Sequence, residues 1–415
     1  MSELSVQRPA VKMRLWTPAF SIITLISFLI GLVQLSLSTN LPLYVVSVYE
    51  STTSAGAMVG AFALAAMLGR PFAGQLIDRL SKPKLYLAGT VFFTVGIAML
   101  LDQGSLTWLV AARIVQGLGF SLLSTVAGAM IADVLHPDRL GSGIAIYTVT
   151  GSLANAMGPV AGLTIAQNYG FPAFFKTILV ISILSILIIP TLFGQKASPS
   201  HLVSESSPEP IAKDLAQAKT AQGDWRHKIT SLIEPTALAP ASVMLFLAIT
   251  YGALLGFMPI LARTKNLGSP GTYFAIQSAA VLAIRVIMPF LVNRLPTVRL
   301  IQLAIGMLIP ALAILLASRH PGMFYSSAAL YGAGFGLAFP LMNTVVFERC
   351  PPQARGRANA TFYLALDLGI GAGTILLGYL ANWLQLEAVF FVALLIAILA
   401  FLIAPRLLNS VGQER

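Results

Sequence analysis

About twelve long apolar runs follow one another along this chain of 415 residues, and no other feature limits its fold as much. A helix needs roughly 20 mostly apolar residues to cross about 30 Å of hydrocarbon. The runs are continuously apolar rather than alternating, so they indicate helices and not strands. They cover residues 18–40, 53–77, 85–102, 106–132, 141–166, 173–194, 237–261, 271–292, 299–317, 323–347, 358–381 and 387–405. We therefore predict an all-α integral membrane protein with twelve transmembrane helices.

The composition agrees with this class and excludes others. Only 10% of the residues are charged, whereas a soluble domain carries about 25%. This excludes a soluble enzyme, a secreted module and a disordered regulator. Cys350 is the single cysteine and none of the four histidines has a partner at ligand spacing, so we expect no disulfide framework, no metal site and no cofactor. The first apolar run is too long for the core of a cleaved signal peptide, so we expect it to be retained.

The net charge of +11 raises the question of a nucleic-acid partner. Of the 26 Lys and Arg residues, 19 lie in the N-terminal tail and in the segments on the same side of the predicted helices. The segments on the opposite side hold only Arg263, Lys265 and Arg319. The other four lie within predicted helices or at their edges: Arg70, Arg113, Lys176 and Arg285. This asymmetry predicts cytoplasmic termini and explains the basic charge without a nucleic-acid partner.

One polar segment divides the chain into two sets of six apolar runs. Residues 195–236 contain Ser-Pro and Pro-Glu-Pro sequences and no membrane-spanning run. We predict an N-terminal six-helix bundle at 1–194, a cytoplasmic linker at 195–236 and a C-terminal six-helix bundle at 237–415.

The two sets are copies of each other. An offset of 215 residues aligns identical Arg, Gly and Pro residues without a gap, which shared hydrophobicity does not explain. The identical pairs include Arg70 with Arg285, Arg79 with Arg294, Gly117 with Gly332, Gly119 with Gly334, Pro137 with Pro352 and Gly158 with Gly373. The sequence therefore predicts two parallel six-helix repeats.

Small and charged residues are concentrated between the second and third runs, in the stretch Gly69–Lys84. Gly74 would let helices approach closely, and Asp78 can pair with groups from the opposite half. Arg79 follows Asp78 directly. Arg79 and the neighbouring lysines can also serve only as topology charges.

Arg113 lies inside the fourth run, followed by Gln116, Gly117 and Gly119. A guanidinium is costly in hydrocarbon, so it should face the interior of the bundle or a wet cavity. Alternatively, backbone carbonyls satisfy it and it only sets helix packing.

The fifth run contains Gly151, Gly158, Pro159 and Gly162. Small residues permit close packing of helices, and proline permits a bend. Ordinary tight packing is the alternative to a functional role.

These three stretches and the duplication resemble the major facilitator superfamily of transporters, in its drug-efflux-like branch, over residues 18–405. The resemblance implies a substrate site between the halves, alternating access, a latch role for Gly74, Asp78 and Arg79, and a role for Arg113 in proton transfer or in shaping the site. The fifth-run motif is typical of exporters, although Ala154 and Leu163 stand where glycines are usual. The run from Asp367 to Ile370 and the Arg70/Arg285 pair are also similar to bacterial exporters of opine metallophores such as staphylopine.

Asp367 is the one carboxylate in the middle of a predicted helix. It lies about ten residues above the expected cytoplasmic start of its helix, which is roughly 15 Å. An acid placed there can exchange a proton as the cavity alternates between the two sides, so we expect Asp367 to couple transport to protons together with Arg113. Alternatively, Asp367 is a permanent buried ion pair with Arg113 or Arg285.

The remaining candidates are cationic, polar or aromatic. Arg70 and Arg285 lie at equivalent positions several residues inside the cytoplasmic ends of their helices, and either can extend its side chain to the interface. Arg285 lies in an Ala/Val/Ile context and can instead meet an anionic group. The substrate-cavity candidates are Gln34, Asn40, Gln116, Tyr147, Asn155, Tyr251, Gln277, Arg285, Asn343 and Tyr363.

We predict a secondary active transporter of a bacterial inner membrane, which exports a small organic molecule such as a drug or metallophore in exchange for protons. No catalytic grouping or phosphate-binding glycine loop is present, so we do not expect an enzyme. The expected partners are the small-molecule substrate, protons and the lipid bilayer, and the chain is expected to be a monomer. A proton-coupled uptake symporter and a lipid flippase are the alternatives.

Overall fold

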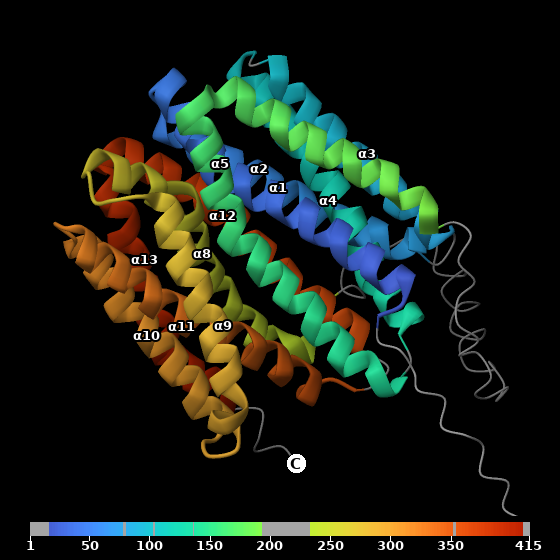
Figure 1. Cartoon of the computed structure of the whole chain (residues 1–415). Helices are drawn as coiled ribbons and strands as arrows, with labels where there is room; N and C mark the ends of the chain where they lie inside the picture. The colour runs from blue at the N-terminus through green and yellow to red at the C-terminus, as the bar shows by residue number, and fades with distance from the viewer. Residues whose placement is uncertain are drawn as a thin grey trace, which may run out of the picture.

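The computed structural model describes residues 16–77, 80–102, 104–135, 137–192, 233–351 and 354–409. Within these ranges the chain is almost entirely helical and contains no β-strand (Figure 1). Eleven of the described helices are long and apolar enough to cross a bilayer. The prediction of an all-α membrane fold is therefore confirmed.

Among the described residues the N-terminal half contains five long helices, the last of them interrupted at Gly170, and the C-terminal half contains six. Thr17, Ser105 and Ser269 begin three of them, each accepting a hydrogen bond from the backbone N–H three residues later. The N-terminal helices are α1 (Pro18–Tyr49), α2 (Thr52–Ile77), α3 (Lys82–Met99), α4 (Leu106–Val134) and α5 (Pro137–Ile188). The C-terminal helices are α8 (Leu238–Thr264), α9 (Pro270–Val292), α10 (Thr297–Ala317), α11 (Pro321–Arg349), α12 (Arg355–Leu384) and α13 (Leu386–Asn409).

Helix α5 contains two of the predicted spans. A straight helix of its 52 residues would be about 78 Å long, more than twice the hydrocarbon thickness. Gly170 interrupts it with a φ of 81°, a backbone conformation that glycine adopts without strain. In Figure 1 the chain reverses there, and the later residues of α5 run back alongside the N-terminal half. The arms on either side of Gly170 contain the predicted helices at 141–166 and 173–194, the latter as far as residue 192.

Each half buries a hydrophobic core of its own. In the N-terminal half α1 packs on α5, and α4 packs on α2 and α3. In the C-terminal half α8 packs on α12 and α13, and α11 packs on α9 and α10. Most of the predicted linker, residues 195–232, lies outside the described residues, so its extent remains a prediction.

The halves meet mainly along two seams, α2 against α12 and α5 against α9, and α8 also contacts α1 and α2. The first seam is close because small residues form it. A Cβ on Gly60 would lie 2.6 Å from the Gly371 carbonyl oxygen, and one on Gly56 would lie 3.2 Å from Gly378 Cα. Thr53 Oγ1 also donates to the Gly378 carbonyl across this seam. Side chains larger than hydrogen would therefore separate α2 from α12.

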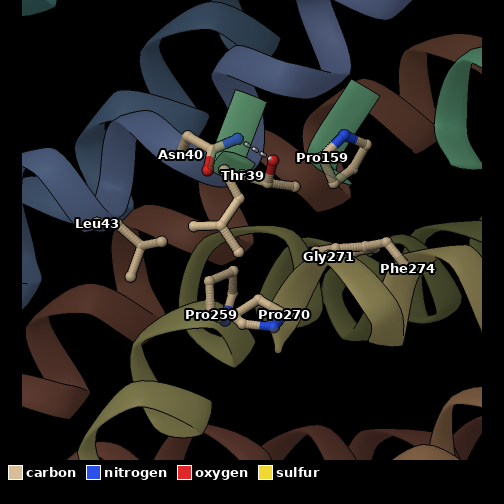
Figure 2. A pocket seen from close by; sticks show the side chains of 9 residues that line it. Thr39, Asn40, Leu43, Pro159, Pro259, Pro270, Gly271 and Phe274 are labelled. Carbon is tan, nitrogen blue, oxygen red and sulfur yellow. Dashed lines mark hydrogen bonds between the residues drawn. The ribbon is translucent and has the colours of Figure 1, made fainter. Parts of the chain in front are cut away.

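The two halves come together near one end of the bundle. We call the end where α1 begins, at Pro18, the N-terminal end, and the end where α1 stops, at Tyr49, the far end. Near the far end, side chains of α1, α5, α8 and α9 line a narrow space, drawn in Figure 2, that is too small for a water molecule; we call it the sealed region. The converging residues are Thr39, Asn40, Leu43, Pro159, Leu163, Pro259, Pro270, Gly271 and Phe274.

Candidate functional site

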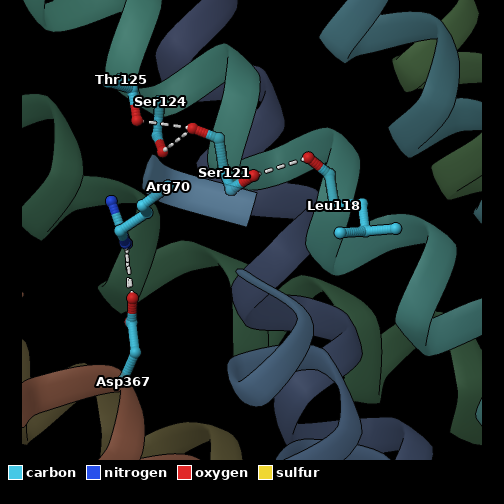
Figure 3. Close-up of polar contacts among 6 residues, drawn as sticks. All are labelled: Arg70, Leu118, Ser121, Ser124, Thr125 and Asp367. Atoms are coloured by element: carbon cyan, nitrogen blue, oxygen red, sulfur yellow. Dashed lines mark hydrogen bonds and ion pairs between the residues drawn. The ribbon is translucent and has the colours of Figure 1, made fainter. Parts of the chain in front are cut away.

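An ion pair crosses the α2–α12 seam. Arg70 Nε donates to Asp367 Oδ2 at 2.5 Å, and the second nitrogen contact, to Oδ1, is 3.5 Å (Figure 3). The Asp367 side chain is 11% exposed and that of Arg70 is 23% exposed. The Arg70 guanidinium also lies 5.4 Å from the centre of the Tyr363 ring, one helical turn from Asp367. This arrangement holds the two charges in a largely water-excluded contact.

The partner of Asp367 differs from those considered from the sequence. If Asp367 formed an ion pair, the sequence suggested Arg113 or Arg285 as its partner; that pairing is wrong, because Arg70 pairs with Asp367 instead of only extending to the interface. The antiparallel register of α2 and α12 places Arg70 opposite Asp367, 297 positions apart in sequence. The α4 hydroxyls drawn beside the pair, on Ser121, Ser124 and Thr125, donate to carbonyls of their own helix (Figure 3).

Arg113 lies inside the N-terminal half, away from Asp367. Its side chain is fully buried; Nε donates to the Met58 carbonyl at 2.8 Å and one terminal nitrogen donates to Gln116 Oε1 at 2.6 Å. The guanidinium lies 4.4 Å from the centre of the Phe62 ring. The second terminal nitrogen has no protein partner among the described residues. These contacts join α4 to α2, which agrees with the packing role considered from the sequence.

Arg285 lies on the other seam. One of its terminal nitrogens donates to the Thr148 carbonyl on α5 at 3.2 Å. None of the ion pairs found in the described part of the chain includes Arg285. Its charge is therefore met by a backbone carbonyl alone.

Polar side chains also connect α5, α8 and α9. Asn155 Nδ2 donates to Ser278 Oγ at 3.0 Å, and Tyr251 donates to Asn155 Oδ1 at 3.4 Å. The neighbouring Gln277 is buried, and its Oε1 has no protein partner among the described residues. Two predicted cavity residues, Asn155 and Tyr251, are thus brought together between the halves.

The other cavity candidates are dispersed. Gln34 donates to Ser38 on its own helix, and Asn40 lines the sealed region while donating to the Ser36 carbonyl. Tyr147 is half-buried on α5, and Asn343 is half-buried on α11. The structure therefore does not gather all ten candidates into one cavity.

A row of aromatic rings was missed in the sequence. Tyr331, Phe335 and Phe339 on α11 recur every four residues, a spacing that places them on one helix face. Phe335 stacks on Tyr251 with ring centres 4.7 Å apart, and Phe339 reaches Tyr363 at 6.3 Å. The row thus runs from the Asn155 contact to the Arg70–Asp367 pair. The four-residue spacing was the available signal.

The candidate latch is described only in part. Asp78 and Arg79 lie outside the described residues. No other residue lies within 4 Å of the position that a Gly74 Cβ would occupy, so the close approach expected there is not seen. Lys82, from the same basic stretch, forms an ion pair with Asp133 of α4 within the N-terminal half.

The fifth-run motif packs α5 against α1. A Cβ on Gly158 would lie 2.7 Å from the Leu32 carbonyl oxygen, and one on Gly162 would lie 2.6 Å from Asn40 Nδ2. Gly151 has open space around it, and Pro159 lines the sealed region. Gly158 and Gly162 therefore let α5 pack closely against α1, and a role of this motif in export stays a prediction.

No group of three or more His, Cys, Asp or Glu side chains suited to a metal ion occurs in the described ranges.

Comparisons with known proteins agree with this fold. A family model described as Major Facilitator Superfamily matches residues 23–360 and 299–412. The uncharacterized MFS-type transporter YhhS of Escherichia coli is 27% identical over 391 residues, covering 89% of each chain. The staphylopine export protein of Staphylococcus aureus is 23% identical over 86% of this chain and 88% of its own length.

Solved structures share the fold at low sequence identity. A bacterial homologue of the lysosomal transporter Spinster, in an inward-facing and unoccupied conformation, superposes with a TM-score of 0.75 at 14% identity, covering 95% of this chain and 98% of its own. The nucleoside transporter NupG superposes with a TM-score of 0.74 at 13% identity, covering 94% and 99%. From the duplicated sequence, the helical fold and the matching family model, we conclude that the chain is a multi-pass membrane transporter of the major facilitator superfamily.

Proposed function

We propose that this transporter exports a small organic molecule across a bacterial cytoplasmic membrane in exchange for protons, with both termini in the cytoplasm. The observation that carries the proposal is the Arg70–Asp367 pair. Of the ion pairs between described residues, it is the one that joins the two halves. Its carboxylate is also the one acidic group in the middle of a predicted span.

Protonation of Asp367 would change the contact between the halves. The ionised carboxylate attracts Arg70 and holds α12 against α2. A neutral carboxylic acid loses that attraction, so proton binding weakens this part of the seam while the glycine contacts persist. Because the halves must separate and rejoin in alternating access, a proton that controls one seam contributes to the transport cycle.

Two observations support export. The chain resembles a staphylopine exporter, and its fifth helix contains the Gly158-Pro159 sequence typical of exporters. The proposed topology puts the far end, where the halves pack closely, outside the cell.

Everted membrane vesicles test the coupling. Respiration acidifies their lumen, so a proton-coupled exporter accumulates substrate inside; ethidium and N-acetylphenylalanine serve as cationic and anionic probes. We expect Asp367→Asn to abolish proton-driven accumulation while the protein still inserts and folds. Asp133→Asn is the matched control, because Asp133 pairs with Lys82 within one half. Wild-type accumulation by Asp367→Asn would contradict the proposal.

The same vesicles separate export from the uptake alternative. Protons leaving the lumen drive an antiporter to take the probe in. They would drive a symporter to carry preloaded probe out. Release of preloaded probe would therefore identify an uptake symporter.

A further inference from the structure

The duplication provides an internal comparison between the two seams. The offset of 215 residues aligns Arg70 of α2 with Arg285 of α9, and Asp367 of α12 with Ser152 of α5. It also aligns Tyr363 with Thr148. One seam therefore has an Arg and an Asp at these positions, whereas the equivalent seam has an Arg and a Ser.

The contacts follow the same correspondence. Arg70 reaches the turn of α12 that contains Tyr363 and Asp367. Arg285 reaches the equivalent turn of α5, where the Thr148 carbonyl accepts from Arg285 at 3.2 Å and from Ser152 Oγ at 3.3 Å. The Ser152 side chain and the Arg285 guanidinium thus share one acceptor. A carboxylate is missing where the other seam has one.

This leaves Arg285 with unused binding capacity. A guanidinium has five N–H donors and a planar shape that matches a carboxylate. Among the described residues Arg285 makes one hydrogen bond, to a neutral carbonyl. It is half-buried and lies seven residues, or about 10 Å, from the end of α9. An anion that reached this seam would complete an ion pair there.

Neighbouring groups can hold the rest of such a molecule. Asn155 lies one turn beyond Ser152 on α5 and hydrogen-bonds both Ser278 and Tyr251. The half-buried rings of Tyr251 and Phe335 stack on each other close by. They offer an aromatic surface and amide and hydroxyl groups next to the Arg285 seam.

We propose that the substrate supplies the missing carboxylate: Arg285 binds the carboxylate of a small organic acid, and Tyr251 and Phe335 contact its apolar part. This inference rests on the proposed transport function and names its substrate class. With the acid bound, each seam contains one ion pair. Arg70 pairs with Asp367 in the α2–α12 seam, and Arg285 pairs with the substrate carboxylate in the α5–α9 seam.

Binding to the purified full-length protein in phosphatidylcholine nanodiscs tests the inference without a proton gradient. The probes are N-acetylphenylalanine and N-acetylphenylalaninamide, which differ only in the carboxylate. We expect the acid to bind and to raise the thermal unfolding temperature, and the amide to bind about tenfold more weakly or worse. Arg285→Gln should remove the preference for the acid, whereas Arg319→Gln, at an exposed arginine, should keep it.

A second variant restores the missing charge from within the protein. The new carboxylate in Ser152→Asp should pair with Arg285, raise the unfolding temperature and prevent the acid from binding. Ser152→Asn introduces a side chain of the same size as Asp but without the charge, and it should have none of these effects. The stabilisation should vanish in the Ser152→Asp/Arg285→Gln double variant. If Ser152→Asp does not fold, the Arg285→Gln comparison decides alone.

Several results would overturn the inference. Three of them are no binding of the acid, equal binding of acid and amide, and unchanged binding of the acid in Arg285→Gln. The fourth is loss of acid binding when phosphatidylglycerol replaces phosphatidylcholine, which would assign the anion to a lipid headgroup.

The two proposals can fail separately. If Asp367→Asn loses proton-driven accumulation but the expected binding is not seen, the substrate class is wrong and the transport proposal stands. If the binding results hold but Asp367→Asn transports normally, the proton coupling is wrong.

Discussion

Removing the charge of Asp367 should shift the conformational equilibrium of the whole transporter. The Arg70–Asp367 contact is made in the conformation whose far end is sealed, so Asp367→Asn should destabilise that conformation relative to one in which the far ends separate. The shift depends on how much free energy the pair contributes.

The geometry sets the size of that contribution. Removing one partner of a fully buried pair costs about 3–5 kcal/mol, whereas an exposed pair contributes about 1 kcal/mol or less. Asp367 is largely buried, but Arg70 is 23% exposed and retains its contact with the Tyr363 ring. We therefore expect an effect of about 2 kcal/mol, which is about a 30-fold change in the ratio of the two conformations.

Double electron–electron resonance measures this ratio. Cys350 is the single cysteine, so a Cys350→Ala background accepts spin labels at Val48→Cys and Trp383→Cys. Both positions are exposed near the far end, on α1 and α12. Asp367→Asn should increase the population with the longer label-to-label distance. Lowering the pH of the unaltered protein should act in the same direction, because protonation also neutralises the carboxylate.

Two results would refute this reasoning. One is an unchanged distance distribution in Asp367→Asn across pH. The other is an equal shift in Asp133→Asn, whose ion pair lies within the N-terminal half and should not report on the seam.

Two further predictions concern packing. Gly60→Leu should prevent α2 from packing against α12, because even a Cβ there would lie 2.6 Å from the Gly371 carbonyl oxygen. The same spin labels should then report mostly separated far ends. A wild-type distance distribution would contradict this prediction. Arg113→Lys should lower stability by about 1–3 kcal/mol, because an ammonium cannot reproduce the fork that reaches Met58 and Gln116. Its thermal unfolding in detergent should show a lower midpoint, and an unchanged midpoint would show that the fork is dispensable.

Much of the fold could be predicted because the bilayer imposes it. Runs of about 20 apolar residues leave the backbone only the helix as a spanning structure, so the helix positions follow from hydropathy. The same holds for α5, whose arms on either side of Gly170 correspond to two predicted spans.

The candidate site was less predictable, because it is made by pairs of helices. Asp367 could be singled out as an intramembrane acid, but its partner could not. Which side chain meets it depends on the register and rotation of α2 against α12, and hydropathy does not encode either. For the same reason Arg113, a cation deep in a span, could be placed in the interior but not assigned to the contact between α4 and α2.

The sequence by itself determined that this chain is a duplicated bundle of membrane helices, because solvation by lipid acts on each segment separately and repeats persist in the residue order. Only the tertiary structure decided how the buried charges are distributed. It joined Arg70 to Asp367 across one seam and left Arg285 facing a serine and a carbonyl across the other. That difference arises from close packing between helices far apart in the chain, where an ångström of register changes which charges meet.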